Sequence, residues 1–294
     1  MPFVTARGLR FHTQQLGPGR GTEGAEGGRP APPVVMLHGL FTGSLASWWF
    51  TAAPAVARTH TVRLLDLRGH GLSDCPPDGY DTATMVDDVL ALTDDLAPFA
   101  VVGHSYGGLL GIRLALAHPD RVTALACIEA PLVAMRDPGP HASRSAGPLG
   151  PEGAVVGGAA SGEDGPDDER DAPAPDASDT ERRLLTETTI LADLRAEPPV
   201  TDDDLRALAV PTLFAFGSRS WCAPAADRMR AVLPGAPCHV LEGGHALHLD
   251  ARREVADLLV DFLDEPGANA AEGVAAERDP LHHDPFHQNP VPYG

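Results

Sequence analysis

Ser105 lies in the motif Gly103-His104-Ser105-Tyr106-Gly107, which could make its hydroxyl a nucleophile. An apolar run, residues 99–102, precedes the motif, and a helix-like stretch, residues 109–118, follows it. Gly-x-Ser-x-Gly between a strand and a helix is typical of a sharp turn that raises a serine above a sheet. A glycine-rich turn without chemistry is the alternative, but the strand–turn–helix setting favours the nucleophile.

A serine hydroxyl needs a histidine to accept its proton and an acid to orient that histidine. Gly243-Gly244-His245 follows the last predicted strand, which ends at Glu242, and the two glycines let the chain turn back toward the serine. We therefore predict that His245 is the base. His248 is the other candidate, and we interpret it as a packed side chain.

Backbone N–H groups could stabilise the negative charge that develops on an attacked carbonyl oxygen. His38-Gly39-Leu40 directly follows the apolar run 34–37. We predict that the N–H groups of Leu40 and Tyr106 form this oxyanion hole. The imidazoles of His38 and His104 are interpreted as packing or bracing groups without a chemical role.

Apolar runs alternate with amphipathic stretches along most of the chain. The runs predict strands at 34–37, 61–67, 99–102, 122–129, 212–217 and 239–242. Helical spacing predicts helices at 47–58, 81–96, 109–118, 180–196, 202–209, 223–233 and 251–263. Segments 4–6 and 9–14 predict an N-terminal hairpin. Strands that alternate with helices predict an α/β fold with a mostly parallel sheet covered on both faces.

Four segments together resemble the α/β-hydrolase fold superfamily, in its serine hydrolase branch: His38-Gly39, 66–74, 103–108 and Gly244-His245. The resemblance runs from about residue 3 to 263, apart from an acidic insertion. It implies a mostly parallel sheet flanked by helices, with a lid insertion, and serine hydrolase activity. It also implies that the turn containing Asp66 and Arg68 is structural.

The acid of the triad departs from the family pattern. The family usually has Gly-x-x-Asp followed by a proline four residues later, and segment 217–224 fits this frame with Ser220 in the aspartate's place. The superfamily has a second acid position, at the end of the strand after the nucleophile helix, and Glu129 stands there. A branch of the haloalkane dehalogenases has a glutamate at that position. We assign Glu129 as the acid; the alternative is a glutamate that fixes the base of the lid beside a Ser105–His245 dyad.

The domain prediction has three parts. Residues 1–130 and 202–264 form the α/β-hydrolase core, 131–201 form the lid, and 265–294 form a disordered tail. Within the lid, residues 137–179 carry ten acidic residues against two arginines and almost no large apolar residues, which predicts disorder.

The formal net charge of −19 argues against a nucleic-acid partner. No apolar run reaches the 18 residues of a membrane span, and residues 1–8 lack the features of a secretion signal, so we expect a cytoplasmic protein without a membrane partner.

The four cysteines have no C-x-x-C spacing, so we expect reduced thiols and no zinc site. His282, His283 and His287 lie in the predicted disordered tail, which offers no scaffold for a metal. No cofactor is expected, and the sequence does not indicate an oligomeric state.

These observations favour a serine esterase or thioesterase that acts on a small-molecule acyl substrate through an acyl-enzyme on Ser105. Phe41, Trp48, Trp49 and the lid helix from Thr180 are candidate pocket residues, although the two tryptophans fit a core helix equally well. A fold relative that performs elimination, acyl transfer or cyclisation is the second hypothesis. A catalytically silent binding protein is the third, supported only by the missing aspartate.

Overall fold

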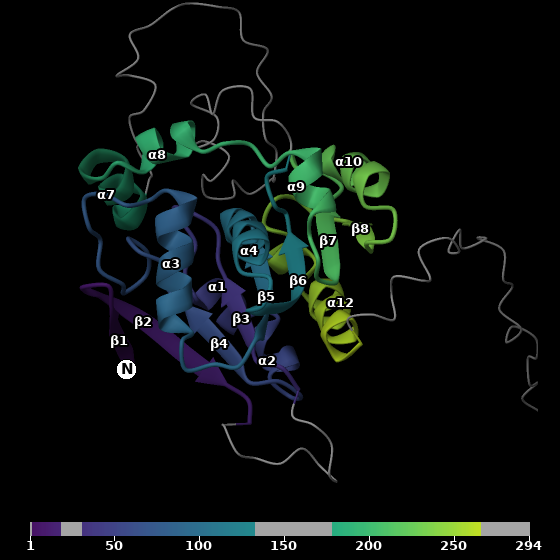
Figure 1. Ribbon diagram of the computed structural model, residues 1–294, viewed down its shortest axis with the longest axis horizontal. Coiled ribbons are helices and arrows are strands. Elements are labelled where there is room, and N and C mark those ends of the chain that lie inside the picture. The colour runs from purple at the N-terminus through teal and green to yellow at the C-terminus, as the bar shows by residue number, and fades with distance from the viewer. Residues whose placement is uncertain (1, 19–30, 133–177, 266–294) are drawn as a thin grey trace, which may run out of the picture.

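The computed structural model describes residues 2–18, 31–132 and 178–265 (Figure 1). Its eight strands form one sheet in the order β1-β2-β4-β3-β5-β6-β7-β8. The strands are β1 (Phe3–Ala6), β2 (Leu9–Leu16), β3 (Val34–Leu37), β4 (Val62–Leu65), β5 (Phe99–His104), β6 (Val122–Ile128), β7 (Thr212–Gly217) and β8 (Cys238–Leu241). Among the strands of the described residues, only the pairs β1–β2 and β2–β4 are antiparallel. The predicted hairpin and the mostly parallel sheet are therefore confirmed.

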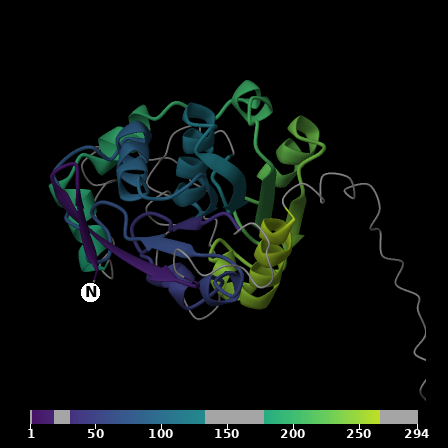
Figure 2. The ribbon, with the colours of Figure 1, turned by 60° about the horizontal axis from the view of Figure 1, so that its bottom comes forward.

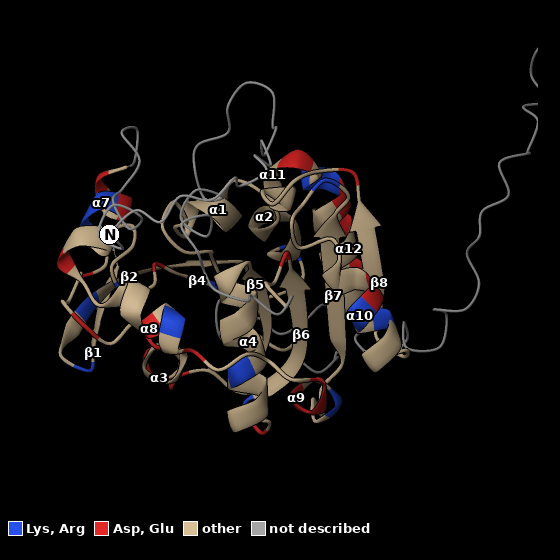
Figure 3. Ribbon diagram, turned by 90° about the horizontal axis from the view of Figure 1, so that it is seen from above, with Lys and Arg blue, Asp and Glu red and all other residues tan. Residues whose placement is uncertain are grey.

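Helices cover both faces of the sheet. They are α1 (Ala46–Trp49), α2 (Ala53–Val56), α3 (Thr82–Leu92), α4 (Tyr106–Ala117), α7 (Asp179–Glu187), α8 (Ile190–Ala196), α9 (Asp202–Arg206), α10 (Ala225–Val232), α11 (Leu247–Asp250) and α12 (Arg252–Asp264). Figure 3 shows α1, α2 and α12 on one side of the sheet, and α3 and α4 on the other. In Figure 2 the N-terminal hairpin lies at one edge of the sheet and α12 lies toward the other. None of the described helices is long and apolar enough to cross a bilayer.

Alternate residues of each strand point to opposite faces, so the sheet builds two cores. On β3, Val35 and Leu37 pack in the core shared with α3, α4 and α10. Val34 and Met36 pack in the core shared with α1, α2 and α12. All four side chains are fully buried, as expected for a central strand covered by helices on both faces. These cores fix the carboxyl ends of the parallel strands, where the loops that bear the candidate site begin.

Two predicted helices are each divided in the structure. The predicted helix 47–58 is wrong as a single element, because α2 begins anew around Pro54, which stands in its first turn. The predicted helix 180–196 is divided at Thr188, whose hydroxyl donates to the Leu184 carbonyl at 2.6 Å and accepts from the Ile190 N–H at 3.2 Å. A side chain that satisfies both helix ends competes with a continuous helical ladder, which explains the break between α7 and α8.

The described part of the predicted lid is attached to the core beside α3. α8 lies near the first turn of α3 (Figure 1), where Asp193 accepts from the Tyr80 N–H at 3.0 Å and Glu197 accepts from the Thr82 hydroxyl at 2.7 Å. Of the segments predicted to be disordered, 137–177 and 266–294 lie outside the described residues. The proposed boundaries of core and lid stay predictions.

Candidate active site

Ser105 occupies the turn between β5 and α4 in a backbone conformation that few residues other than glycine adopt, with φ 52° and ψ −121°. The glycines of the motif are required by close approach. A Cβ built on Gly103 would lie 2.2 Å from the Gly107 carbonyl oxygen, and one on Gly107 would lie 2.5 Å from the Leu37 carbonyl oxygen. A strained backbone like that of Ser105 is typical of functional turns. The turn raises the Ser105 side chain above the carboxyl edge of the sheet.

Ser105, His245 and Glu129 form a continuous chain of hydrogen bonds. Ser105 Oγ lies 2.9 Å from His245 Nε2, and His245 Nδ1 lies 3.0 Å from a Glu129 carboxylate oxygen. A carboxylate can only accept, so Nδ1 carries the ring proton and Nε2 is left to accept the serine proton. The structure thus brings together the three residues that the sequence placed far apart in the chain.

Glu129 is fully buried at the end of β6, where its carboxylate accepts from three donors. Besides His245, these donors are the Gly217 N–H and the Ser220 hydroxyl, both from the carboxyl end of β7. A buried carboxylate is costly unless it is hydrogen-bonded, and this one has a full set of partners. Ser220, which stands where the family has its aspartate, therefore supports the glutamate of the neighbouring strand.

Cys222 also contacts Glu129, Ser220 and His245, although no motif in the sequence marks this cysteine. Its Sγ is 3.7 Å from His245 Nδ1 and 3.4 Å from the Glu129 carbonyl oxygen, and its N–H donates to the Ser220 hydroxyl at 3.1 Å. Burial and the nearby Glu129 carboxylate raise the pKa of the Cys222 thiol well above its ordinary value. Its position two residues after Ser220, in a loop expected at the site, was the signal that could have revealed it.

His38 fixes the loop that follows β3. Its Nδ1 donates to the Gly39 carbonyl at 2.7 Å, and its Nε2 accepts from the Leu67 N–H at 3.0 Å. Burial lowers the pKa of His38, which keeps the ring neutral and able to accept. The bracing role predicted for His38 agrees with these contacts.

His70 fixes the next part of this loop in the same way. Its Nε2 accepts from the Phe41 N–H at 2.8 Å, while its Nδ1 donates to the Arg68 carbonyl at 2.8 Å. Burial and the neighbouring His38 lower the pKa of His70 to about 3. Because the Phe41 N–H is occupied by His70, Leu40 remains the candidate donor of this loop. The oxyanion-hole roles of Leu40 and Tyr106 stay predictions.

His104 connects the nucleophile turn to the loop that carries the base. Its Nε2 donates to the His245 carbonyl at 2.8 Å, and its ring centroid lies 4.3 Å from that of His248. Burial, and secondarily the neighbouring His248 and His245, lowers the pKa of His104 well below its ordinary value. His248 is buried against Trp48, with ring centroids 5.6 Å apart, so it packs as predicted and His245 is the histidine that contacts Ser105.

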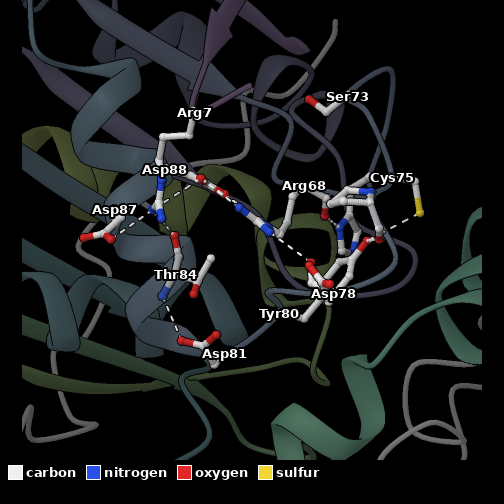
Figure 4. Close-up of polar contacts among 12 residues, drawn as sticks. Arg7, Arg68, Ser73, Cys75, Asp78, Tyr80, Asp81, Thr84, Asp87 and Asp88 are labelled. Carbon is white, nitrogen blue, oxygen red and sulfur yellow. Dashed lines mark hydrogen bonds and ion pairs between the residues drawn. The ribbon is translucent and has the colours of Figure 1, made fainter. Parts of the chain in front are cut away.

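Arg68 is a structural residue. Its guanidinium pairs with the Asp88 carboxylate through two hydrogen bonds of 2.6 and 2.9 Å and donates to the Asp78 carbonyl at 3.0 Å (Figure 4). The segment held in this way carries Tyr80, whose carbonyl accepts from the Tyr106 hydroxyl at 3.2 Å. The Arg68–Asp88 pair therefore helps to position Tyr80. The Tyr80 carbonyl in turn holds Tyr106, the residue after Ser105, and the Tyr80 N–H holds Asp193 of α8.

The three candidate pocket residues occupy different places. Phe41 is nearly buried and packs in a small apolar cluster with Tyr80, Leu184 and Ile190, so it lies against α7 and α8. Trp48 is fully buried, and its indole N–H donates to the Leu37 carbonyl at 2.9 Å. Trp48 and the half-buried Trp49 both pack in the α1–α2–α12 core, away from α7 and α8. Of the three, only Phe41 contacts the described part of the predicted lid.

The sequence profile described as the α/β hydrolase fold matches residues 32–149. The enol-lactonase of Burkholderia xenovorans LB400 has a similar structure, with a TM-score of 0.62 at 24% identity over 90% of this chain and 100% of that one. RutD of Cronobacter sakazakii (strain ATCC BAA-894), provisionally named a carbamate hydrolase, is 36% identical over 40% of this chain and 50% of its own length. A fluoroacetate dehalogenase of a Burkholderia species is 39% identical over 35% of each chain.

The profile match, the sheet order and the shared structure agree that the chain has the α/β-hydrolase fold. The chain spans about half the length or less of the curated relatives it matches. Those relatives carry names of different reactions, including a hydrolase, a dehalogenase and an acetyltransferase component. The fold is thus shared, while the reaction and the substrate have to be argued from the site.

Proposed function

We propose that this chain is a serine hydrolase that cleaves a carboxylic ester or thioester through an acyl-enzyme on Ser105. The observation that carries the proposal is the hydrogen-bonded chain Ser105–His245–Glu129, with the serine on a strained turn. This complete series of hydrogen bonds disfavours a catalytically silent binding protein. Ser220 does not supply the carboxylate, but Glu129 at the end of β6 does.

In the first half of the reaction the Ser105 oxygen attacks the acyl carbon of the substrate. His245 Nε2 takes the hydroxyl proton and then delivers it to the leaving alcohol or thiol. The Glu129 carboxylate, 3.0 Å from Nδ1, holds the ring in the required tautomer and stabilises the imidazolium that forms. The N–H groups of Leu40 and Tyr106 donate to the carbonyl oxygen as it becomes negative.

In the second half a water molecule releases the acyl group. His245 accepts a proton from the water, which attacks the acyl carbon, and then returns a proton to Ser105 as the acid product leaves. Each proton thus moves through the same ring nitrogen in both halves. The groups that hold Glu129 and His245 in place therefore serve both steps.

The surroundings of Phe41 support an apolar acyl substrate. Phe41 follows the proposed oxyanion donor Leu40 directly, and both contact the apolar cluster that includes Leu184 and Ile190 of the predicted lid. The structural neighbours are under 25% identical and share only the fold, so the acyl group is not taken from them. All four cysteines of the chain are free thiols, which supports the proposed cytoplasmic location.

Labelling with a fluorophosphonate probe tests the proposal. The wild-type chain should be labelled, and Ser105→Ala and His245→Ala should each abolish labelling. Ser218→Ala is the matched control, since Ser218 is an exposed serine in the loop after β7 and should leave labelling unchanged. An unlabelled wild-type chain, or equal labelling of Ser105→Ala, would overturn the proposal. Turnover of p-nitrophenyl esters compared with acyl thioesters then separates the two substrate classes.

A further inference from the structure

Three potential metal ligands of different chemistry meet behind the catalytic histidine. A Glu129 carboxylate oxygen, Cys222 Sγ and a His245 ring nitrogen all lie within 4.8 Å of one another. His245 Nδ1 is 3.0 Å from the carboxylate oxygen and 3.7 Å from the sulfur. The carboxylate and the imidazole take part in the proposed hydrolysis, whereas the fully buried thiol of Cys222 does not.

The spacing of these three atoms suits a tetrahedral zinc ion. Bonds of about 2.3 Å to sulfur and about 2.0–2.2 Å to nitrogen and oxygen place tetrahedral ligands about 3.6 Å apart for sulfur and nitrogen. The same bonds place nitrogen and oxygen about 3.4 Å apart. The observed separations for these two pairs are 3.7 and 3.0 Å, and all three atoms lie within 4.8 Å of one another, so small movements of the side chains would bring them to bonding distance of one ion. Thiolate and imidazole ligands favour zinc over magnesium and calcium, which prefer oxygen.

The carboxylate ligand is already oriented by other groups. The Gly217 N–H and the Ser220 hydroxyl donate to the Glu129 carboxylate, and the Ser220 hydroxyl also accepts from the Cys222 N–H. Hydrogen bonds of this kind behind ligating groups are typical of protein metal sites. The loop that replaces the family aspartate with Ser220 thus holds two of the three ligands in place.

We propose that Glu129, Cys222 and His245 form a binding site for a zinc ion that switches off Ser105. On binding, the thiol of Cys222 loses its proton to solvent, and the thiolate and the carboxylate balance the charge of Zn²⁺. The Nδ1 lone pair of His245 binds the ion, so the single ring proton of the neutral imidazole moves to Nε2. A protonated Nε2 cannot accept the hydroxyl proton of Ser105, and the nucleophile is no longer activated.

Zinc binding is measured first, because it does not depend on the proposed function. The full-length chain is titrated with ZnCl₂ by calorimetry and with CoCl₂ by absorption spectroscopy. Wild type and Ser105→Ala should bind one ion more tightly than Cys222→Ala, by at least about 10-fold in dissociation constant. Cobalt should give a thiolate-to-metal charge-transfer band that is absent in Cys222→Ala. Cys238→Ala is the matched cysteine control and should keep both signals, and the tail histidines are common to every variant.

The switch itself rests on the proposed function and is read by fluorophosphonate labelling with and without zinc. Zinc should slow labelling of wild type and Cys238→Ala by at least about 10-fold, a chelator should restore it, and Cys222→Ala should resist the metal. If wild type is not labelled even without metal, the hydrolase proposal fails while the binding result stands. If Cys222→Ala binds both metals as wild type does, the zinc proposal is overturned. Should Cys222→Ala fail to fold, Cys222→Ser takes its place with the same criteria.

Discussion

The carboxyl ends of β6 and β7 are neighbours in the sheet but supply different chemistry. Glu129 directly follows β6, and its fully buried carboxylate contacts His245. β7 ends in Gly217, and Ser220 lies in the loop that follows. The Gly217 N–H and the Ser220 hydroxyl donate hydrogen bonds to the Glu129 carboxylate, but neither residue carries a carboxylate itself. One strand end provides the charge, and the other provides the donors that make the burial of the charge tolerable.

If Glu129 is the acid, as proposed, the acid stands at the end of β6 instead of the end of β7 while its direction toward the histidine is kept. The register of the sheet makes the exchange possible, because Ile128 pairs with Ala215 and the two strands therefore end at nearly the same level. A left-handed backbone at Glu129, with φ 59°, turns the chain at this point, and its N–H donates to the Ala215 carbonyl at 2.8 Å. A side chain from either strand end can thus be directed at the same imidazole.

Removing the charge at the end of β6 should have the largest effect. Glu129→Gln keeps the size of the side chain but presents an amide to His245, which disfavours the tautomer that accepts the serine proton. We expect kcat to fall by on the order of 10²–10⁴ while KM changes little. Steady-state kinetics on the best ester or thioester measures both constants. A wild-type rate for this variant would leave a Ser105–His245 dyad as the machinery.

Returning a carboxylate at the end of β7 tests whether the two positions are equivalent. In the Glu129→Gln background, Ser220→Asp places an acid where the family usually has it. We expect a gain in kcat of about 10-fold over Glu129→Gln alone, since part of the orientation of His245 is restored. Ser218→Asp in the same background is the control, because an exposed carboxylate nearby should give no recovery. Equal rates for the two double variants would show that a carboxylate at position 220 has no advantage over an exposed one, and the two strand ends would then not be equivalent acid positions.

How well the sequence predicts each part of the site depends on whether a local pattern encodes it. Ser105 and His245 follow from glycine motifs at strand ends, since a turn needs particular residues at fixed places. Glu129 required the family comparison, because a single glutamate after a strand has no pattern of its own. The participation of Ser220 and Cys222 depends on how two loops pack together, which spacing along the chain does not express. The same holds for Trp48, which helical spacing alone could not assign to core or pocket.

Removing only the support at β7 should have a smaller effect than removing the charge. Ser220→Ala deletes the hydroxyl that donates to the Glu129 carboxylate but leaves the Gly217 N–H and His245 as partners. A hydrogen bond to a charged group contributes about 1.5–3 kcal/mol to stability, so the variant should unfold at a lower denaturant concentration. We expect kcat to fall by about 10-fold or less. A loss as large as that of Glu129→Gln would mean that Ser220, rather than the glutamate, determines the orientation of the histidine.

The loop that follows β3 offers the last comparison, because neutral imidazoles support it, whereas Gly217 and Ser220 support the carboxylate of Glu129. His70 accepts from the Phe41 N–H only while its Nε2 is unprotonated. The pKa of His70 is lowered from 6.5 to about 3 by burial and by the neighbouring His38. At a pH between these two values, His70 therefore binds a proton in the unfolded chain but not in the folded chain. The free energy of unfolding should consequently fall as the pH falls from about 6.5 toward 3.

This loss can be measured as the melting temperature between pH 7 and 5, above the range in which most carboxylates titrate. We expect the wild-type melting temperature to fall by on the order of a few degrees over this interval. His70→Gln should be less stable at pH 7, because glutamine does not reproduce both hydrogen bonds. Its melting temperature should nevertheless depend less on pH, since one buried titratable group is gone. A slope equal to that of wild type would show that His70 does not stay neutral in the folded protein, and the bracing of the Phe41 N–H would then need another account.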